Sequence, residues 1–476
     1  MELDYDPGEG INFWRRIELL SGYPKNEHMP IEAMIFESNA LFKLPDLLHD
    51  VKANPQEPLL TVMDKTRMTR LGQDLKQLVL RILHEAGWQV RPIVLEPDLT
   101  GQVHTDMLHI EAVKAAITSG ATLLAIGSGT VCDITKHAAY LYERENGTPL
   151  VFVVFQTANS VSAYTSNMAP IFVNGVKRTL PSRYPTALIC DLETLADAPY
   201  EMTVAGVGDL LAAYVSIPDW YLAYRLGMDH TYTDFARLLM GPMDDILIET
   251  AESIRERTQH GMQILAKLIA LGGLAMSLSH ATTPMSGYEH VMSHILDMIA
   301  EINHQPLAQH GTQVSLTTLL AAGAYQHFLQ EFIPQEVILS SCYPDAKEME
   351  KEIRQTFLEI DPSGKASEEC WSDYRLKLEA WYTNRESFIA FLNDWGKIRR
   401  KIANWSRKPE KLLKILCAIN APLTFSQMIP SITEAQARFA FMNAPLMRKR
   451  LTLGDMLIFL NWDRKKLWED VWKVMK

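Results

Sequence analysis

The 476-residue chain is poor in cysteine and in positive charge. Its five cysteines are odd in number and scattered, and no two of them form a Cys-x-x-Cys pair. That pattern argues against a disulfide framework and a thiolate zinc site. Lys and Arg number 46 against 57 Asp and Glu, which gives a net charge of -11. Non-specific binding of nucleic acid needs a basic surface, so no nucleic-acid partner is expected.

Long apolar runs are also scarce. The first ten residues, MELDYDPGEG, are acidic and polar, whereas a secretory signal has a basic start and an apolar core. The most apolar stretch, residues 265–279, is shorter than a membrane span and contains Lys267. We therefore expect no membrane span and a cytoplasmic protein.

Hydrophobic periodicity divides the chain into two parts. In the first part, short apolar runs alternate with amphipathic segments, which is typical of a mainly parallel sheet covered by helices. After about residue 195 the apolar positions recur at helical spacing. We predict an α/β Rossmann-like domain over residues 1–195 and an all-α domain over residues 196–476. The expected strands are 58–64, 89–95, 122–127, 148–155 and 186–191, and the first expected helices are 67–87 and 107–120.

A glycine-containing turn follows the third expected strand, in GSGTVCDITK, residues 127–136. Gly127 and Gly129 permit a tight turn, and the free N–H groups of the helix that follows can bind a diphosphate. Two glycines at such a turn can also serve a purely steric purpose. Asp64 ends an earlier strand, where an acid can accept hydrogen bonds from a ribose diol. Together the two features indicate a dinucleotide site.

A cluster of hydroxyl groups follows the next strand, in QTANSVSAYTS, residues 156–166. Ligands of open α/β sheets bind at the carboxyl ends of the strands, so these hydroxyls are candidates to line a ligand site. A polar turn that satisfies its own backbone is the alternative. The residues are Thr157, Ser160, Ser162 and Ser166.

Candidate metal ligands lie in the helical half. Asp209 lies in AGVGDLLAAY, and His310 lies in AQHGTQVSL. His290 and His294, in SGYEHVMSH, are four residues apart and therefore share one helical face. One carboxylate and two imidazoles leave a coordination position open for a substrate oxygen, as a catalytic divalent metal requires. The alternative to a metal site is that Asp209 caps a helix and that the histidines have no common function.

These segments together resemble one known family. GSGTVCDITK, the hydroxyl pattern, AGVGDLL, SGYEHVMSH and the C-terminal RKRLTLGDMLIFL are similar to sn-glycerol-1-phosphate dehydrogenases, which belong with glycerol dehydrogenase and the iron-containing alcohol dehydrogenases. The resemblance covers nearly the whole chain. It implies an NAD(P)-linked, metal-dependent oxidoreductase that interconverts a small phosphorylated ketone and its alcohol, of the dihydroxyacetone phosphate and sn-glycerol 1-phosphate type.

The resemblance also implies a role for each matching residue. Asp209, His290 and His310 would bind one divalent metal, which in such enzymes is zinc, nickel or iron. His294 would face the substrate, and Asp209 would lie near both substrate and metal. The residues implied for NAD or NADP are Asp64 at the ribose, Gly127, Ser128, Gly129, Thr130 and Val131 at the diphosphate, and Thr157, Ser160 and Ser166 along the dinucleotide.

Two positions depart from the family pattern, both on the substrate side. Ser162 stands where these enzymes usually carry a substrate-contacting Asp, and Ala213 stands where they usually carry Lys. Ser162 can form a hydrogen bond but is a poor base, so His294, or a water that it orients, is the expected proton relay. Lys177 and Arg178 are candidates to meet a substrate phosphate, and a solvated pair in a loop is the alternative.

Two other functions are compatible with the sequence. A sugar-phosphate cyclase of the 3-dehydroquinate synthase type shares the two-domain layout, NAD and a metal, and the absence of net NADH turnover would distinguish it. A non-catalytic nucleotide-binding homologue is expected to lose its metal ligands. Asp64 favours NAD, since an acid repels the 2′-phosphate of NADP. A homodimer is expected because it is the commonest oligomer of soluble enzymes.

Overall fold

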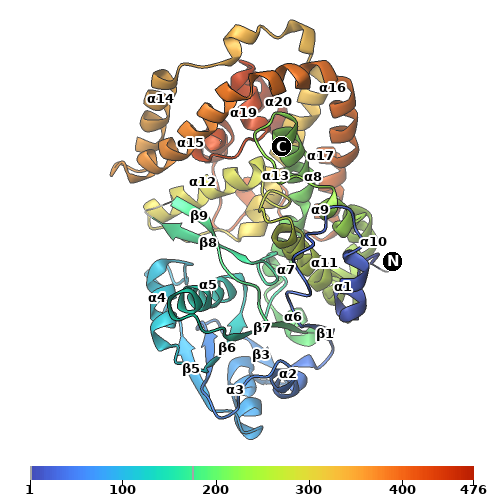
Figure 1. The fold of residues 1–476 in the computed structure, drawn as a ribbon, viewed down its shortest axis with the longest axis vertical. Helices are drawn as coiled ribbons and strands as arrows, with labels where there is room; N and C mark the ends of the chain where they lie inside the picture. The colour runs from blue at the N-terminus through green and yellow to red at the C-terminus, as the bar shows by residue number, and fades with distance from the viewer. Residues whose placement is uncertain (1–2, 174–175, 476) are drawn as a thin grey trace. The chain divides into compact units, whose positions relative to one another are not determined.

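The computed structural model in Figure 1 describes residues 3–173 and 176–475. The chain forms two compact units. The first comprises the described parts of Met1–Val173, Lys177–Leu210 and Asp234–Ser279, and the second those of Asn174–Val176, Leu211–Thr233 and His280–Lys476. A parallel sheet with helices, followed by an all-helical region, confirms the predicted fold class. The predicted boundary after residue 195 stays a prediction.

The first unit is organised around a six-stranded parallel sheet. The inner strands consist almost entirely of buried residues, as a sheet covered by helices requires. Helices α4 and α5 lie on one side of the sheet, and α2 and α3 pack a hydrophobic core on the other (Figure 1). In spatial order the strands are β1 (Ala33–Glu37), β10 (Ala187–Asp191), β7 (Val151–Gln156), β6 (Thr122–Gly127), β2 (Leu59–Met63) and β5 (Val90–Val94).

The strand order reverses between β2 and β6. After β2 the chain continues outward to β5 and then crosses back to β6, β7 and β10 on the other side of β2. At such a switch point the connections leave in opposite directions, and a crevice opens at the carboxyl ends of the strands. Because β2 and β6 are hydrogen-bonded neighbours, Asp64 after β2 and the turn that begins at Gly127 lie at the same edge of the sheet.

All five expected strands are confirmed, but the expected helix over residues 67–87 is only partly right. The helix α3 covers Leu75–Glu85. The residues before it form a short hairpin of β3 (Thr69–Arg70) and β4 (Gln73–Asp74). Gly72, with a φ of 70°, forms part of the hairpin turn, and this backbone conformation is incompatible with a helix.

Besides β3 and β4, three further strands were not predicted. β1 is an edge strand of the main sheet, and β8 (Met168–Val173) and β9 (Val176–Pro181) form a separate two-stranded sheet. In β1 the buried and partly exposed positions alternate over only five residues, a pattern too short to stand out from the surrounding sequence.

Helices make up the rest of both units. Those of the first unit are α1 (Ile11–Ile17), α2 (Leu44–Asp50), α3, α4 (Met107–Ala116), α5 (Gly129–Asn146), α6 (Leu192–Asp197), α7 (Tyr200–Leu211, whose last residue belongs to the second unit), α9 (Phe235–Met240), α10 (Met243–Arg255) and α11 (Gln259–Leu278). Those of the second unit are α8 (Ala213–Arg225), α12 (Tyr288–Ile302), α13 (His310–Glu331), α14 (Ala346–Leu358), α15 (Lys365–Thr383), α16 (Arg385–Trp405), α17 (Pro409–Ala418), α18 (Glu434–Asn443), α19 (Leu453–Phe459) and α20 (Arg464–Trp472).

Helix α11 covers all but the last residue of the stretch expected to be too short for a membrane span. With 20 residues and a mean hydropathy of 1.5, α11 is long and apolar enough to cross a membrane. However, 89% of the 18-residue apolar segment of this helix is buried inside the structure, as is typical of a core helix. Among the described residues no other helix meets the criteria of length and composition.

Candidate active site

The glycine turn connects β6 directly to α5. A Cβ atom on Gly127 would lie 2.5 Å from the Cβ atom of Val131, and a Cβ atom on Gly129 would lie 2.5 Å from Cγ2 of Val161. The side chains of the protein itself therefore require glycine at both positions. Ser128 is the N-cap residue of α5 but its side chain makes no capping hydrogen bond, so no cap covers the first N–H groups of the helix. This tight turn with an uncapped helix start fits a diphosphate group.

Asp64, the predicted ribose ligand, lies at the carboxyl end of β2, but its carboxylate already has partners. Thr66 donates to Oδ2 through its hydroxyl at 2.8 Å, and Lys76 forms an ion pair with Oδ1. The Lys76 ammonium also donates to the backbone carbonyls of Asp64 and Thr66 at 2.6 and 2.7 Å. Lys76 thus fixes the loop after β2 and holds the carboxylate in place.

The predicted hydroxyl cluster follows β7 and is joined to the glycine turn. The Thr157 N–H group donates to the Gly127 carbonyl at 3.1 Å. Ser160 Oγ lies 3.1 Å from the Tyr164 hydroxyl, and Ser166 Oγ accepts from the Met168 N–H group at 3.1 Å. The side chains of Ser160 and Ser166 therefore have partners within the turn or directly after it, as the alternative interpretation expected.

Ser162 differs from the other hydroxyl residues because its backbone holds a candidate metal ligand. Its N–H group donates to Oδ2 of Asp209 at 2.9 Å. Its own Oγ is buried and has no hydrogen-bond partner among the described residues. A buried hydroxyl without a partner is costly, and a substrate hydroxyl or carbonyl is the kind of group that would satisfy it.

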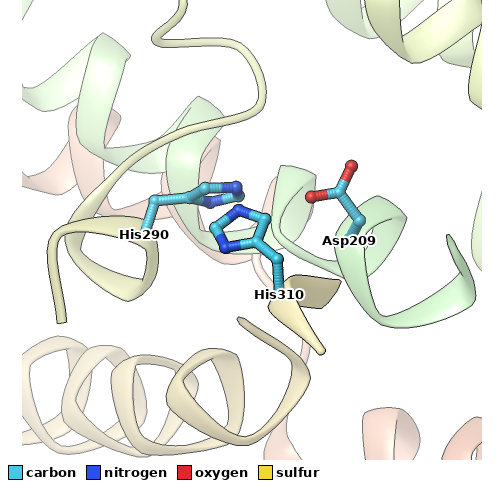
Figure 2. Close-up of side chains that lie close together, drawn as sticks. All are labelled: Asp209, His290 and His310. Carbon is cyan, nitrogen blue, oxygen red and sulfur yellow. The ribbon is translucent and has the colours of Figure 1, made fainter. Parts of the chain in front are cut away.

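The three predicted metal ligands lie together. Asp209 comes from the last turn of α7, His290 from the first turn of α12, and His310 is the first residue of α13. Their side chains converge in Figure 2, and one potential ligand atom from each lies within 4.8 Å of the other two. Asp209 and His290 are buried and His310 is partly buried. A carboxylate with two imidazoles is a donor set that suits a divalent metal such as zinc, nickel or iron.

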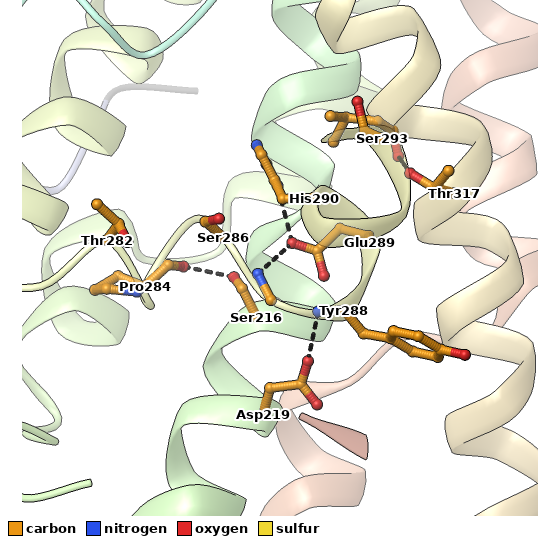
Figure 3. Close-up of polar contacts among 12 residues, drawn as sticks. Ser216, Asp219, Thr282, Pro284, Ser286, Tyr288, Glu289, His290, Ser293 and Thr317 are labelled. Carbon is orange, nitrogen blue, oxygen red and sulfur yellow. Dashed lines mark hydrogen bonds and ion pairs between the residues drawn. The ribbon is translucent and has the colours of Figure 1, made fainter. Parts of the chain in front are cut away.

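Glu289 orients His290. Figure 3 shows Glu289 beside His290, and Oε1 of Glu289 lies 2.9 Å from Nδ1 of the His290 ring. The same oxygen accepts a hydrogen bond from the Gly287 N–H group at 2.7 Å. Since a carboxylate only accepts hydrogen bonds, this contact assigns a proton to Nδ1 and leaves Nε2 as the ring nitrogen available to a metal. Oε2 of Glu289 is buried and has no hydrogen-bond partner among the described residues.

A second buried carboxylate, Asp219, fixes the start of α12. Asp219 accepts hydrogen bonds from the backbone N–H groups of Tyr288 and Leu453, both at 2.8 Å, and from the Tyr325 hydroxyl. Burial, together with the nearby charge of Glu289, raises the pKa of Asp219 to about 8. The loop before His290 is thereby tied to α8, α13 and α19 of the same unit.

His310 has a polar support of its own. Its Nδ1 atom lies 3.4 Å from Ser293 Oγ and 4.0 Å from a carboxylate oxygen of Asp297. The Gln313 side chain donates to both of these residues, at 2.8 Å to Ser293 Oγ and 3.0 Å to Asp297 Oδ1. These contacts come from α12 and α13 and fix the orientation of the imidazole, as polar neighbours do for metal-binding histidines.

His294 lies beside the metal-ligand candidates and contacts a buried cation. Its ring centroid lies 6.0 Å from that of His310 and 6.3 Å from that of His290. Arg448 places a guanidinium nitrogen 3.4 Å from Nδ1 of His294. Because arginine can only donate, this arrangement uses Nδ1 as an acceptor and leaves the proton of a neutral His294 on Nε2.

Sequence reasoning missed the roles of Glu289 and Arg448, although both lie in segments that carried the resemblance. Glu289 is the residue before His290 in SGYEHVMSH, and Arg448 is the first arginine in RKRLTLGDMLIFL. The two cations that were predicted instead, Lys177 and Arg178, lie on β9, where Lys177 stacks 5.7 Å above the Phe172 ring. Ala213 is the buried first residue of α8.

Comparison with known proteins identifies related dehydrogenases. A family model for iron-containing alcohol dehydrogenase matches residues 35–199. The NAD(P)+ glycerol-1-phosphate dehydrogenase of Bacillus licheniformis is 28% identical over 358 residues, which cover 73% of this chain and 85% of that protein. The enzyme of the same name from Bacillus subtilis is 30% identical over 288 residues, which cover 60% of this chain and 70% of that protein.

A solved structure shows the same fold. The NADH-dependent butanol dehydrogenase A of Thermotoga maritima superposes with a TM-score of 0.56 at 14% identity, over 96% of this chain and 99% of that chain. The chain belongs to the iron-containing alcohol dehydrogenase family, and the two Bacillus relatives above are named glycerol-1-phosphate dehydrogenase. The predicted resemblance and the predicted enzyme class, an NAD(P)-dependent alcohol dehydrogenase with a divalent metal, are confirmed. The cyclase and the non-catalytic homologue are not favoured.

Proposed function

We propose that the chain interconverts dihydroxyacetone phosphate and sn-glycerol 1-phosphate with NAD or NADP. The observation that carries the proposal is the convergence of Asp209, His290 and His310 within 4.8 Å. The names of the relatives, glycerol-1-phosphate dehydrogenase, support the choice of this substrate.

Asp209, His290 and His310 would hold the divalent metal, which supplies a Lewis acid for the substrate oxygen. Two contacts of the chain prepare this set before any ligand binds. Ser162 holds Oδ2 of Asp209 through its backbone, and Glu289 fixes the His290 ring. The Ser162 hydroxyl, buried and without a partner among the described residues, would donate to a substrate oxygen.

The proton of the reaction is assigned to His294. With Nδ1 occupied by Arg448, the Nε2 atom of His294 is the position that would give or take the proton, directly or through a water. Arg448 itself would meet the substrate phosphate, since a guanidinium binds phosphate in a bidentate geometry. This assignment replaces Lys177 and Arg178 as the proposed phosphate ligands.

The dinucleotide would bind at the switch point of the sheet and supply or accept the hydride. The Gly127–Gly129 turn and the start of α5, which includes Thr130 and Val131, would hold its diphosphate. Asp64 would accept from the ribose, Thr157, Ser160 and Ser166 would line the dinucleotide, and an acid at Asp64 favours NAD over NADP. A cytoplasmic homodimer that spans no membrane completes the proposal.

The test combines metal analysis with NADH oxidation, and it uses the purified full-length chain. We expect near-stoichiometric zinc, nickel or iron, and oxidation of NADH on addition of dihydroxyacetone phosphate. His290→Ala and His310→Ala should lose both the metal and the activity, whereas His304→Ala, at an exposed position between α12 and α13, should keep both. Metal retained in both ligand variants, or no NADH oxidation by the metal-loaded protein, would refute the proposal.

A further inference from the structure

The second unit contains a hollow of about 390 Å³ that is unrelated to the candidate active site. It lies between residues 322–330 of α13 and residues 396–408, which comprise the end of α16 and the link to α17. We refer to it as the α13–α16 groove. His310 begins α13, so the groove lies about 18 Å or more farther along that helix. Its volume is in the range of pockets that bind small molecules.

The lining of the α13–α16 groove is strongly basic although the chain as a whole carries a net charge of -11. Four cations line it, namely Arg399, Arg400, Arg407 and Lys408, and the lining contains no acidic residue within the described part of the chain. Such a concentration of one sign creates a local positive potential that attracts anions.

Three of these four cations are available to a ligand. Arg399, Arg400 and Lys408 form no ion pair with any other residue that the structure describes. Arg407 is fixed instead, because it donates to the carbonyls of Asn404 and Trp405 at 3.0 and 3.3 Å and stacks 4.8 Å from the Tyr214 ring centre. The groove thus combines one ordered cation with three unpaired ones.

Gly396 leaves room for a ligand beside the α16 backbone. It lies in the middle of a 21-residue helix, where glycine is less favourable than alanine. A Cβ atom added to Gly396 would meet nothing within 4 Å, so no neighbour in the protein requires glycine there. The space beside the backbone opens into the groove. An occupant that contacts this surface would account for the glycine.

From these observations we propose that the α13–α16 groove binds a small ligand that carries two phosphate groups, such as a bisphosphate or a diphosphate. Arginine and lysine are the side chains that bind phosphate most strongly, and four of them match a ligand of several negative charges. α17 begins at Pro409, directly after Lys408, and has no side-chain cap, so its positive end adds to the field. The phosphate chemistry is shared by soluble metabolites and by lipid headgroups.

The experiment is isothermal titration of the full chain with inorganic pyrophosphate, with NADH at saturation so that the proposed dinucleotide site is filled. We expect one site per chain. Arg399→Gln/Arg400→Gln should weaken binding about tenfold to a hundredfold, since hydrogen bonds to charged groups are lost. Gly396→Ala should also weaken binding while it raises Tm, because alanine favours the helix and fills the groove.

The matched control is Lys397→Gln/Lys414→Gln, which removes two exposed cations, one on α16 and one on α17, that do not line the groove. Co-sedimentation with vesicles that contain phosphatidic acid shows whether the phosphate groups belong to a lipid headgroup or to a soluble ligand. Vesicle binding without pyrophosphate binding, lost in the groove variant, assigns a lipid headgroup, and pyrophosphate binding assigns a soluble ligand. The proposal is overturned if neither probe binds, if the groove variants bind like the parent, or if the control pair weakens binding equally. This binding test is independent of the dehydrogenase activity.

Discussion

Oε1 of Glu289 lies 2.9 Å from Nδ1 of its neighbour His290 and also accepts the Gly287 N–H group at 2.7 Å. The carboxylate is therefore anchored on one side and orients the imidazole on the other. A ring held in this way presents Nε2 in one direction only, which reduces the conformational entropy lost when a metal binds.

Replacing Glu289 should weaken metal binding in a graded manner. In Glu289→Ala the His290 ring loses its acceptor, and metal affinity should fall about tenfold to a hundredfold. Glu289→Gln keeps an acceptor oxygen without the charge, so its loss should be smaller. Competition with a chelator measures the affinity, and Glu301→Ala on the same helix is the control. Unchanged affinity in Glu289→Ala, with Tm confirming a folded protein, would contradict the assigned role.

Substitutions at Gly129 should affect the stability of the protein and its affinity for NADH separately. Gly129→Ala should destabilise the protein by about 1–3 kcal/mol, because its Cβ atom would lie 2.5 Å from Val161 Cγ2. The double variant Gly129→Ala/Val161→Ala should recover most of the lost Tm but not the affinity for NADH, since the methyl group still blocks the approach of a diphosphate. Fluorescence titration with NADH and thermal unfolding measure the two effects. Full recovery of NADH affinity in the double variant would show that the glycine serves packing alone.

Much of the first unit could be predicted because its signals are local. The run TLLAIGSG, residues 122–129, specifies a buried strand and a tight turn within eight residues, and β6 and the start of α5 occur where they were expected. The helix expected at residues 67–87 was partly wrong because the hairpin turn at Gly72 competes with a periodic pattern that continues through it. Local turn chemistry decided that segment, not hydrophobic spacing.

The supporting residues of the site could not be predicted, because tertiary structure selects them. Arg448 contacts His294 across 154 positions of sequence, and Ser162 contacts Asp209 across 47. Glu289 adjoins His290 in sequence, yet its orientation toward the ring depends on the loop that Asp219 fixes. Residue types and spacing identify possible metal ligands, whereas the hydrogen bonds that orient them depend on contacts that no sequence pattern contains.

Arg448 should determine preference for a phosphorylated substrate. In Arg448→Gln the KM for dihydroxyacetone phosphate should rise about tenfold or more, because a charge-assisted contact to phosphate is lost, whereas the KM for dihydroxyacetone should change little. Lys449→Gln alters the adjacent, exposed cation and is the matched control. Steady-state kinetics with both ketones tests this. An equal change for the two substrates would show that Arg448 acts only through His294 and does not bind the phosphate.

His137, on α5, should make the protein less stable in mild acid. It is buried, Nδ1 of its ring has no hydrogen-bond partner among the described residues, and burial together with the neighbouring Lys136 lowers the pKa of His137 from 6.5 to about 4. The folded protein therefore binds this proton less readily than the unfolded chain does. The associated stability is complete above pH 6.5 and is lost as the pH falls toward 4.

After allowance for solvent screening, we expect this loss in mild acid to be about 1–2 kcal/mol. His137→Gln removes the titrating group, so the difference in Tm between pH 7.5 and about pH 4.5 should be smaller in this variant than in the parent. His84→Gln, at an exposed position on α3, should leave that difference unchanged. Thermal unfolding across the pH range measures all three proteins. Parallel curves for the parent and His137→Gln would mean that the loss of stability in acid comes from other groups, because a histidine with the same pKa in the folded and unfolded protein does not couple its proton to unfolding.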